Sequence, residues 1–148
     1  MDYCIVYIST AIERMHVDQL DEIQRRAAQY NAKKHITGML IYSGQYFIQA
    51  IEGRRSRIET LYQRINLDRR HNMCRILLAQ NIRKRAFQQW HMGVLDLQGH
   101  KDLDINLLET LTRTAGSSSE YTGHTALMLL KAFRSMLPDP TIEHHHAA

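Results

Sequence analysis

Three polar residues stand where the hydrophobic pattern of the chain calls for apolar side chains. Tyr7 lies in the middle of a β-rich apolar run, and Asn31 falls on the apolar face of an expected helix. Gln49 shares one face of an expected strand with Phe47 and Ile51. A buried glutamine carries two donors and an acceptor, and leaving such groups unpaired costs about 1–3 kcal/mol. If buried, the three residues need polar partners, which either a small core network or a ligand with polar edges would supply. The alternative is a shift in strand register that exposes them to solvent.

Catalytic and metal-binding chemistry has little support in the sequence. It contains no G-x-S-x-G, Walker or H-E-x-x-H motif and no glycine-rich loop of the kind that holds phosphates. His71 and His91 are the only interior candidates for acid–base work. The three adjacent histidines at 144–146 have no partner ligands at the spacing of a metal site. We therefore expect neither an enzyme nor a metalloprotein.

Charge and cysteine content suggest an unremarkable intracellular protein. The net charge is +4, and the basic cluster at 83–85 lacks the interleaved aromatics that stack on nucleic-acid bases, so nucleic acid is an unlikely partner. Cys4 and Cys74 are far apart and form no C-x-x-C pair, as expected in a reducing compartment. No apolar run is long enough to span a bilayer, and no secretory signal is visible. A cytoplasmic location without membrane attachment is expected.

The elements that must position the polar residues follow from the hydrophobic periodicity. Strands are expected at 3–9, 36–42, 46–51, 74–80 and 91–97, with helices at 17–31 and from Ser56 to about residue 67. Alternation puts Ile5 and Tyr7 on one face of the first strand. Ser43-Gly44 is typical of a tight hairpin turn, and Ser56-x-x-Glu59 of a capping box.

This order predicts an α+β protein. It is the ferredoxin-like arrangement βαββαββ, in which two helices cover one face of the sheet. After Gly99 the pattern changes to a C-terminal helical pair, one helix around 103–111 and one at 126–137, separated by a flexible break at 116–119. We expect this pair to cover the open sheet face or an oligomer seam. The predicted division is a folded unit at 1–98, a helical extension at 99–140 and a disordered tail at 141–148.

A set of spaced motifs resembles one family from residue 3 to about 97. The motifs are Tyr7-x-Ser9, Asn31 followed by Ile36-Thr37-Gly38, Phe47-x-Gln49-x-x-Glu52-Gly53, Asp68-x-Arg70-His71 and Arg85-x-Phe87-x-x-Trp90-x-Met92. Together they look like the BLUF family, the sensors of blue light that use FAD. The C-terminal helical pair resembles that of short BLUF proteins without an attached output domain.

The resemblance implies a cofactor and a place for it. The cofactor is FAD, with FMN or riboflavin tolerated, and its isoalloxazine ring would lie between the two helices against the sheet. Tyr7 would be the redox-active tyrosine, and Gln49 would stand between it and flavin N5. Asn31 would hold the ring near O4 and N3, with Arg70 and His71 near the pyrimidine end.

The resemblance also implies how the signal leaves the ring. Trp90 and Met92 match a pair on the fifth strand that can exchange between buried and exposed positions. The tyrosine would give an electron and a proton to the excited flavin, and the glutamine would relay the proton and return rearranged, by rotation or tautomerisation.

The expected function is therefore a blue-light photoreceptor that turns over no substrate. Its signal would pass to an effector protein in trans or through a homo-oligomer, with the helix at 126–137 as the candidate surface. The alternative is a light-insensitive, ferredoxin-like ligand-binding regulatory module. The Tyr7–Gln49 pairing discriminates between them, because a module without flavin has no need for a buried glutamine at this position.

Overall fold

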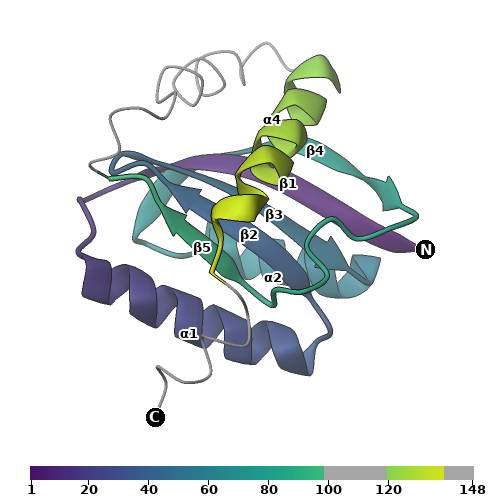
Figure 1. Cartoon of the computed structure of the whole chain (residues 1–148), viewed down its shortest axis with the longest axis horizontal. Coiled ribbons are helices and arrows are strands. Elements are labelled where there is room, and N and C mark those ends of the chain that lie inside the picture. Colours follow the sequence, from purple (N-terminus) through teal and green to yellow (C-terminus); the bar gives the residue numbers. More distant parts are fainter. Residues whose placement is uncertain (99–119, 139–148) are drawn as a thin grey trace.

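A computed structural model describes residues 1–98 and 120–138 of the chain (Figure 1). The elements are β1 (Asp2–Ala11), α1 (Val17–Lys33), β2 (Thr37–Tyr42), β3 (Tyr46–Gly53), α2 (Arg55–Asn66), β4 (His71–Ile82), β5 (Gly93–Asp96), α4 (Glu120–Phe133) and the 3-10 helix η2 (Arg134–Met136). The expected helix around 103–111, the break at 116–119 and the tail at 141–148 lie outside the described residues. No helix in the described part of the chain is long and apolar enough to cross a membrane.

The five strands form one sheet in the order β4-β1-β3-β2-β5. All neighbours are antiparallel except β2 and β5, which pair in parallel. The chain crosses from β1 to β2 through α1 and from β3 to β4 through α2. Because such crossovers are right-handed, both helices lie on the same face of the sheet. The ferredoxin-like α+β prediction is confirmed.

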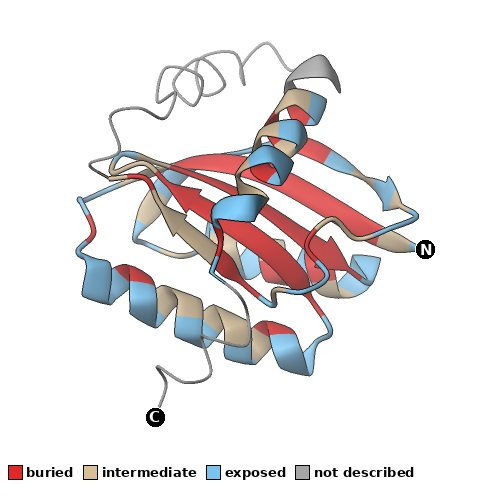
Figure 2. Ribbon diagram, viewed as in Figure 1, coloured by how far each residue is buried: buried red, intermediate tan, exposed pale blue. Residues whose placement is uncertain are grey.

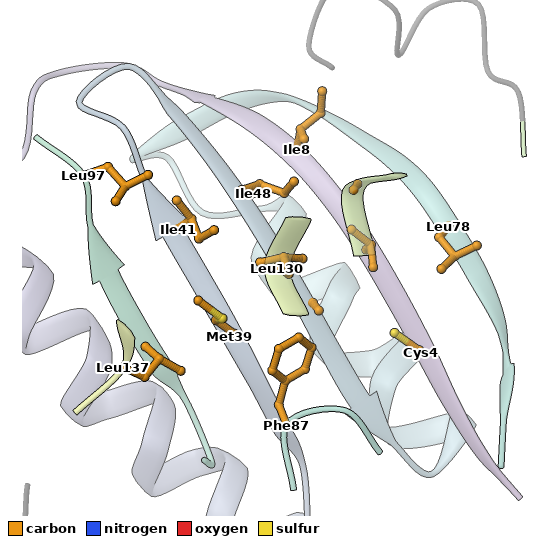
Figure 3. Packing of buried hydrophobic residues seen from close by; sticks show 13 residues of the cluster. Cys4, Ile8, Met39, Ile41, Ile48, Leu78, Phe87, Leu97, Leu130 and Leu137 are labelled. Carbon is orange, nitrogen blue, oxygen red and sulfur yellow. The ribbon is translucent and has the colours of Figure 1, made fainter. Parts of the chain in front are cut away.

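Strand alternation divides the buried residues into two layers, one on each side of the sheet. The central strands are buried along most of their length (Figure 2). Ile5 and Ile51 face α1 and α2, where they join Leu20, Ile58 and Leu61 from the helices. The opposite face carries a second apolar cluster beneath α4, drawn in Figure 3: Cys4, Val6, Ile8, Met39, Ile41, Ile48, Ala50, Leu78, Phe87, Leu97, Ala126, Leu130 and Leu137. The sheet is thus covered on both faces: β1, β2, β3 and β5 contribute to both cores, and β4 contributes to the one beneath α4.

Helix α4 crosses the face of the sheet opposite α1 and α2, as the apolar stripe of residues 126–137 predicts (Figure 1). Gly123 lets it approach β4 closely, since a Cβ at this position would lie 2.2 Å from the Leu77 carbonyl oxygen. The α-helix ends at Phe133, and η2 follows it. The backbone is extended at Leu137, immediately before Pro138, whose ring disfavours a helical conformation in the preceding residue.

The ends of several elements differ from the predictions. Ser56 is not a helix cap, because α2 begins one residue earlier, its N-cap is Arg54 and no side chain caps it. Glu59 forms an ion pair with Arg55 at 2.8 Å instead of closing a capping box. Strand β4 also begins earlier than expected, at His71, and pairs with β1 along almost all of its length.

The fifth strand begins at Gly93 and not at residue 91. A turn precedes it, in which the Trp90 amide donates to the Phe87 carbonyl at 3.0 Å. The Trp90 carbonyl then accepts a hydrogen bond from the Gly38 amide, also at 3.0 Å. Regular pairing with β2 starts only at Gly93, opposite Met39. Trp90 and Met92 therefore lie in the segment that leads into β5.

Candidate functional site

A cavity of about 340 Å³ lies between the sheet and the pair α1 and α2. Its lining combines apolar walls with a few polar groups, as is usual for sites that bind small molecules. The residues that line it are Tyr7, Met15, Ile23, Arg26, Ala27, Tyr30, Asn31, Leu40, Phe47, Gln49, Leu61, Arg64, Ile65, Asp68, Arg70, His71 and Met92.

Tyr7 and Gln49 form the centre of this cavity. They are directly opposed residues on the antiparallel strands β1 and β3, so their side chains leave the same face of the sheet side by side. The Tyr7 hydroxyl donates a hydrogen bond to Gln49 Oε1. At its other end, Gln49 Nε2 donates to the Met92 sulfur at 3.2 Å. The amide is therefore held between an oxygen donor and a soft sulfur acceptor.

The phenol of Tyr7 is kept in its protonated form. The side chain is 3% exposed, and burial raises its pKa well above the ordinary value of 10, with nearby Cys74, Tyr62 and Asp68 acting in the same direction. The Tyr62 ring packs edge-on against Tyr7, with ring centroids 5.5 Å apart. Tyr7 therefore acts as a hydrogen-bond donor to Gln49 at every physiological pH.

Asn31 brings an unsatisfied polar atom to the cavity. The residue is 1% exposed, and its Nδ2 donates to the His91 backbone carbonyl at 2.7 Å. Its Oδ1 is buried and has no hydrogen-bond partner among the described residues. Leaving a buried acceptor unpaired costs about 1–3 kcal/mol, so this atom is suited to a ligand that donates a hydrogen bond.

His71 is fixed by two hydrogen bonds at the start of β4. Its Nε2 lies 2.6 Å from the Ile65 carbonyl oxygen, which can only accept, so Nε2 carries the proton. Nδ1 then accepts from the Ser9 hydroxyl at 2.7 Å in the neutral ring. The Cys74 sulfur lies 3.6–3.7 Å from the two ring nitrogens. The imidazole edge next to Phe47 is thereby held in one orientation at the cavity wall.

Arg70 lies at the exposed rim of the cavity, where it forms an ion pair with Asp68. A hydrogen bond from Arg70 lowers the pKa of the Asp68 carboxyl, and the same contact raises the pKa of Arg70. The guanidinium has five donors, and the ion pair leaves some of them free for a ligand.

The structure brings together every residue that the sequence singled out for the site except Trp90. Trp90 packs against the opposite core, beneath α4, and its Nε1 donates to the Pro138 carbonyl at 3.2 Å. Met92, two residues later, is 3% exposed and lines the cavity. Met92 therefore lies at the cavity, whereas Trp90 lies on the opposite side of the sheet.

Sequence reasoning missed several lining residues. Arg26 and Arg64 follow Ile23 and Leu61 by three residues, so helical spacing could have placed them at the cavity mouth. Tyr30, whose ring carries the Arg64 guanidinium at 4.4 Å, could have been found in the same way. Met15 lies in the loop before α1, and no periodic signal marks it.

The cavity suits a flat aromatic ligand with hydrogen-bonding edges. Ile23, Ala27 and Ile65 provide apolar contact from the two helices, while Leu40 and Phe47 provide it from the sheet. The amide of Gln49 and the orphaned Oδ1 of Asn31 offer polar contacts to the edge of such a ring. The described residues contain no cluster of three or more side chains arranged to bind a metal ion.

A comparison with protein families matches residues 3–93 to the family described as BLUF, sensors of blue-light using FAD. The chain is 31% identical over 84 residues to the photoactivated adenylate cyclase subunit alpha of Euglena gracilis. It is 29% identical over 104 residues to the blue light- and temperature-regulated antirepressor BluF of Escherichia coli. The matches cover 57% and 66% of this chain, but only 8% and 26% of those relatives.

Solved structures of similar fold agree with this match. The dark-state structure of the BLUF protein BlrB has a TM-score of 0.62 and 26% identity, covering 86% of this chain and 96% of that one. The ground state of BlsA has a TM-score of 0.63 and 27% identity, covering 78% and 74% of the two chains. A Klebsiella pneumoniae structure, BlrP1 with FMN and cyclic diGMP, has a TM-score of 0.65 and 29% identity, covering 91% and 35%.

Proposed function

Because the chain belongs to the BLUF family and is a flavin-binding sensor of blue light, we propose that it reports light through the hydrogen-bonded series Tyr7–Gln49–Met92. The observation that carries this proposal is the bond from the Tyr7 hydroxyl to Gln49 Oε1 inside the cavity. A light-insensitive ferredoxin-like module has no use for this buried pair, and neither the family match nor the relatives support it.

The residues around the cavity fit a flavin. We assign Asn31, Arg70 and His71 to holding the ring, together with Tyr7 and Gln49. The free Oδ1 of Asn31 supports this assignment, because it needs a donor that the described residues do not provide. FAD is the family's cofactor, and the FMN in the Klebsiella structure supports a tolerance for FMN or riboflavin.

Bound flavin would supply the absorption of blue light and an acceptor for an electron. We assign Tyr7 the role of electron and proton donor, since its hydroxyl is buried, protonated and already aimed at Gln49. We assign Gln49 the role of relay, because its amide accepts at one end and donates at the other. If the amide rotates or tautomerises, both bonds must change, and the contact with Met92 changes with them.

The route out of the site runs from Met92 to the C-terminal elements. Two residues before Met92, Trp90 bonds the Pro138 carbonyl, and the nearby Ala86 carbonyl accepts a hydrogen bond from Arg134 at 2.5 Å. A shift of the segment at 86–92 would therefore reach η2 directly. Met92 and Trp90 would act as the pair that exchanges inner and outer positions.

The chain would act as a receptor and not as an enzyme. We propose residues 1–98 as the flavin-binding unit, residues 99–140 as the output extension and 141–148 as a disordered tail. The signal would pass to an effector protein in trans, with the receptor working as a homo-oligomer in the cytoplasm. The free thiols of Cys4 and Cys74 support a reducing compartment, and the exposed Met128 on α4 supports a contact surface there.

The test is the visible spectrum of the FAD-loaded chain before and after blue light. The wild-type spectrum should shift slightly to the red and recover in the dark. Gln49→Leu should keep the flavin bound but lose the shift, because leucine can neither accept from Tyr7 nor donate to Met92.

The matched control is Gln63→Leu, on the exposed face of α2, which should shift like the wild type. A normal red shift in Gln49→Leu would remove Gln49 from the mechanism. Failure of the chain to bind added FAD would favour the alternative, a light-insensitive ligand-binding module.

A further inference from the structure

Helix α1 holds the segment that leads into β5 by two consecutive backbone carbonyls. Asn31 Nδ2 donates to the His91 carbonyl at 2.7 Å, and Gln24 Nε2 donates to the Met92 carbonyl at 3.2 Å. A carbonyl can only accept, so both side-chain amides turn their nitrogen toward the segment. Gln24 and Asn31 lie about two helical turns apart on α1, so both project from the same face of the helix.

Met92 is held at its side chain and at its carbonyl by two different elements. Its sulfur accepts from Gln49 Nε2 on β3 at 3.2 Å, in the cavity between the sheet and the two helices. Its carbonyl accepts from Gln24 on α1. A shift of the segment that takes Met92 out of the cavity therefore breaks two hydrogen bonds, and only the first of them belongs to the series Tyr7–Gln49–Met92.

The roles of Gln24 and Asn31 can be separated by their positions. Asn31 is buried and lines the cavity, so its substitution would disturb flavin binding as well as the segment. Gln24 is half-buried and is not among the residues that line the cavity. A substitution of Gln24 removes the bond to the Met92 carbonyl and leaves the residues assigned to the flavin in place.

We propose that Gln24 is a positioning residue, which keeps Met92 at the cavity in the dark by holding its carbonyl. This inference rests on the proposed function, because it takes Met92 and Trp90 to exchange places after illumination. The bond from Gln24 breaks in the lit arrangement and forms again during dark recovery. Helix α1 thereby contributes to the lifetime of the lit arrangement.

The first measurement is the dark recovery of the FAD-loaded full chain after a blue pulse. Gln24→Met keeps the unbranched side chain and a similar helix propensity but removes the donor, so recovery should be slower by roughly two- to tenfold. Gln24→Lys restores a donor of similar reach and should recover within about twofold of the wild type. The matched control is Gln29→Met, at an exposed position of α1, which should recover like the wild type.

The second measurement uses the flavin-free chain. Trp90 is the only tryptophan of the protein, so its fluorescence reports on the segment without interference from other indoles. The indole packs against the core beneath α4, and a looser segment should make it more accessible to acrylamide. Quenching by acrylamide should therefore rise in Gln24→Met and stay at the wild-type level in Gln24→Lys and Gln29→Met.

Recovery of Gln24→Met at the wild-type rate or faster would overturn the inference, as would wild-type quenching of Trp90 in this variant. Equal slowing in Gln24→Lys or in Gln29→Met would also overturn it, because the donor at position 24 would then not be the cause. A wild-type chain that binds FAD but shows no red shift would instead overturn the proposed function. The quenching comparison would still test whether Gln24 holds the segment.

Discussion

Gln49 has chemically different neighbours at the two ends of its amide. The oxygen accepts from a buried phenol, while the nitrogen donates to a thioether, which is a weak acceptor. Breaking the contact to sulfur therefore costs less free energy than breaking a hydrogen bond to oxygen would. The hydrogen bond from Tyr7 is thus the main interaction that opposes an exchange of the donor and acceptor ends of the amide.

Met92→Leu tests how much the weak contact holds. Leucine keeps the apolar volume but removes the acceptor for Gln49 Nε2, so the energy difference between the dark and lit arrangements should change. A neutral hydrogen bond contributes about 0.5–1.5 kcal/mol, so the rate of dark recovery should change by roughly two- to tenfold. The measurement is the decay of the red-shifted absorbance after a blue pulse.

Met39→Leu is the control, since Met39 is fully buried in the opposite core and touches the site through no hydrogen bond. Recovery at the wild-type rate in Met92→Leu would show that the sulfur contact has no part in the cycle.

The residues of the site could be predicted from the sequence where a regular element carries them. Tyr7 and Gln49 each break a strand pattern, and Asn31 breaks a helical one, so their shared cavity follows from periodicity and topology. The sides taken by Trp90 and Met92 could not be predicted, because alternation holds only inside a strand. The turn at 87–90 precedes β5 and sends the indole to the opposite core.

At the scale of elements, the contact of α4 with β4 depends on one glycine. Gly123→Ala would put a Cβ 2.2 Å from the Leu77 carbonyl oxygen, a backbone atom that cannot turn aside. Alanine favours a helix over glycine by about 1 kcal/mol, but overpacking of this kind costs about 1–3 kcal/mol. The net effect should be a lower free energy of unfolding, measured in urea.

The control on the same helix is His124→Ala, at an exposed position, which should stay within about 0.5 kcal/mol of the wild type. If Gly123→Ala were as stable as the wild type or more so, α4 would not be packed as closely as the structure has it.

Element order was more predictable than element ends. Five strands and two crossover helices follow from period and handedness, yet the start of α2 was misplaced. Ser56-x-x-Glu59 matches a capping box, but Arg55 competes for the same glutamate and lies one turn before it. The sequence alone does not decide whether such a glutamate caps the helix or pairs with a nearby arginine, because that depends on which group is closer in space.

Across the whole molecule, Glu52 on β3 connects this strand to β2 and to the segment between β4 and β5. It is 1% exposed, and its carboxylate accepts from Thr37 at 2.9 Å and from the amides of Ala86 and Phe87 at 2.9 and 2.7 Å. Burial raises its pKa above the ordinary value of 4.5 despite these bonds and the charge of Arg85. The folded protein thus holds this proton more tightly than the unfolded chain does.

The free energy of unfolding should therefore fall, through Glu52, as the pH rises from about 4.5 through the raised pKa. Asp2 and Asp68, whose pKa values are lowered by arginine contacts, act in the opposite sense and only below about 3.8. Glu52→Gln lacks the ionisation, so its stability should not show this decline. The measurement is urea unfolding between pH 4.5 and 7.5.

The free energy of unfolding of Glu52→Gln should also be lower by about 1–3 kcal/mol across this pH range, because the amide nitrogen of the glutamine would face a donor instead of an acceptor. Glu59→Gln, exposed on α2, is the control and should keep the wild-type pH dependence. Parallel stability curves for the wild type and Glu52→Gln would contradict the raised pKa.

The alternation of side chains across the sheet has a consequence for how such a protein can diversify. Ile48 and Ala50 face α4, while Gln49 between them faces the cavity. Along β3, the face that lines the cavity and the face that packs against α4 therefore share a backbone but no side chains. Residues on the α4 face can therefore be substituted, in evolution or by design, while the cavity side chains one residue away stay the same.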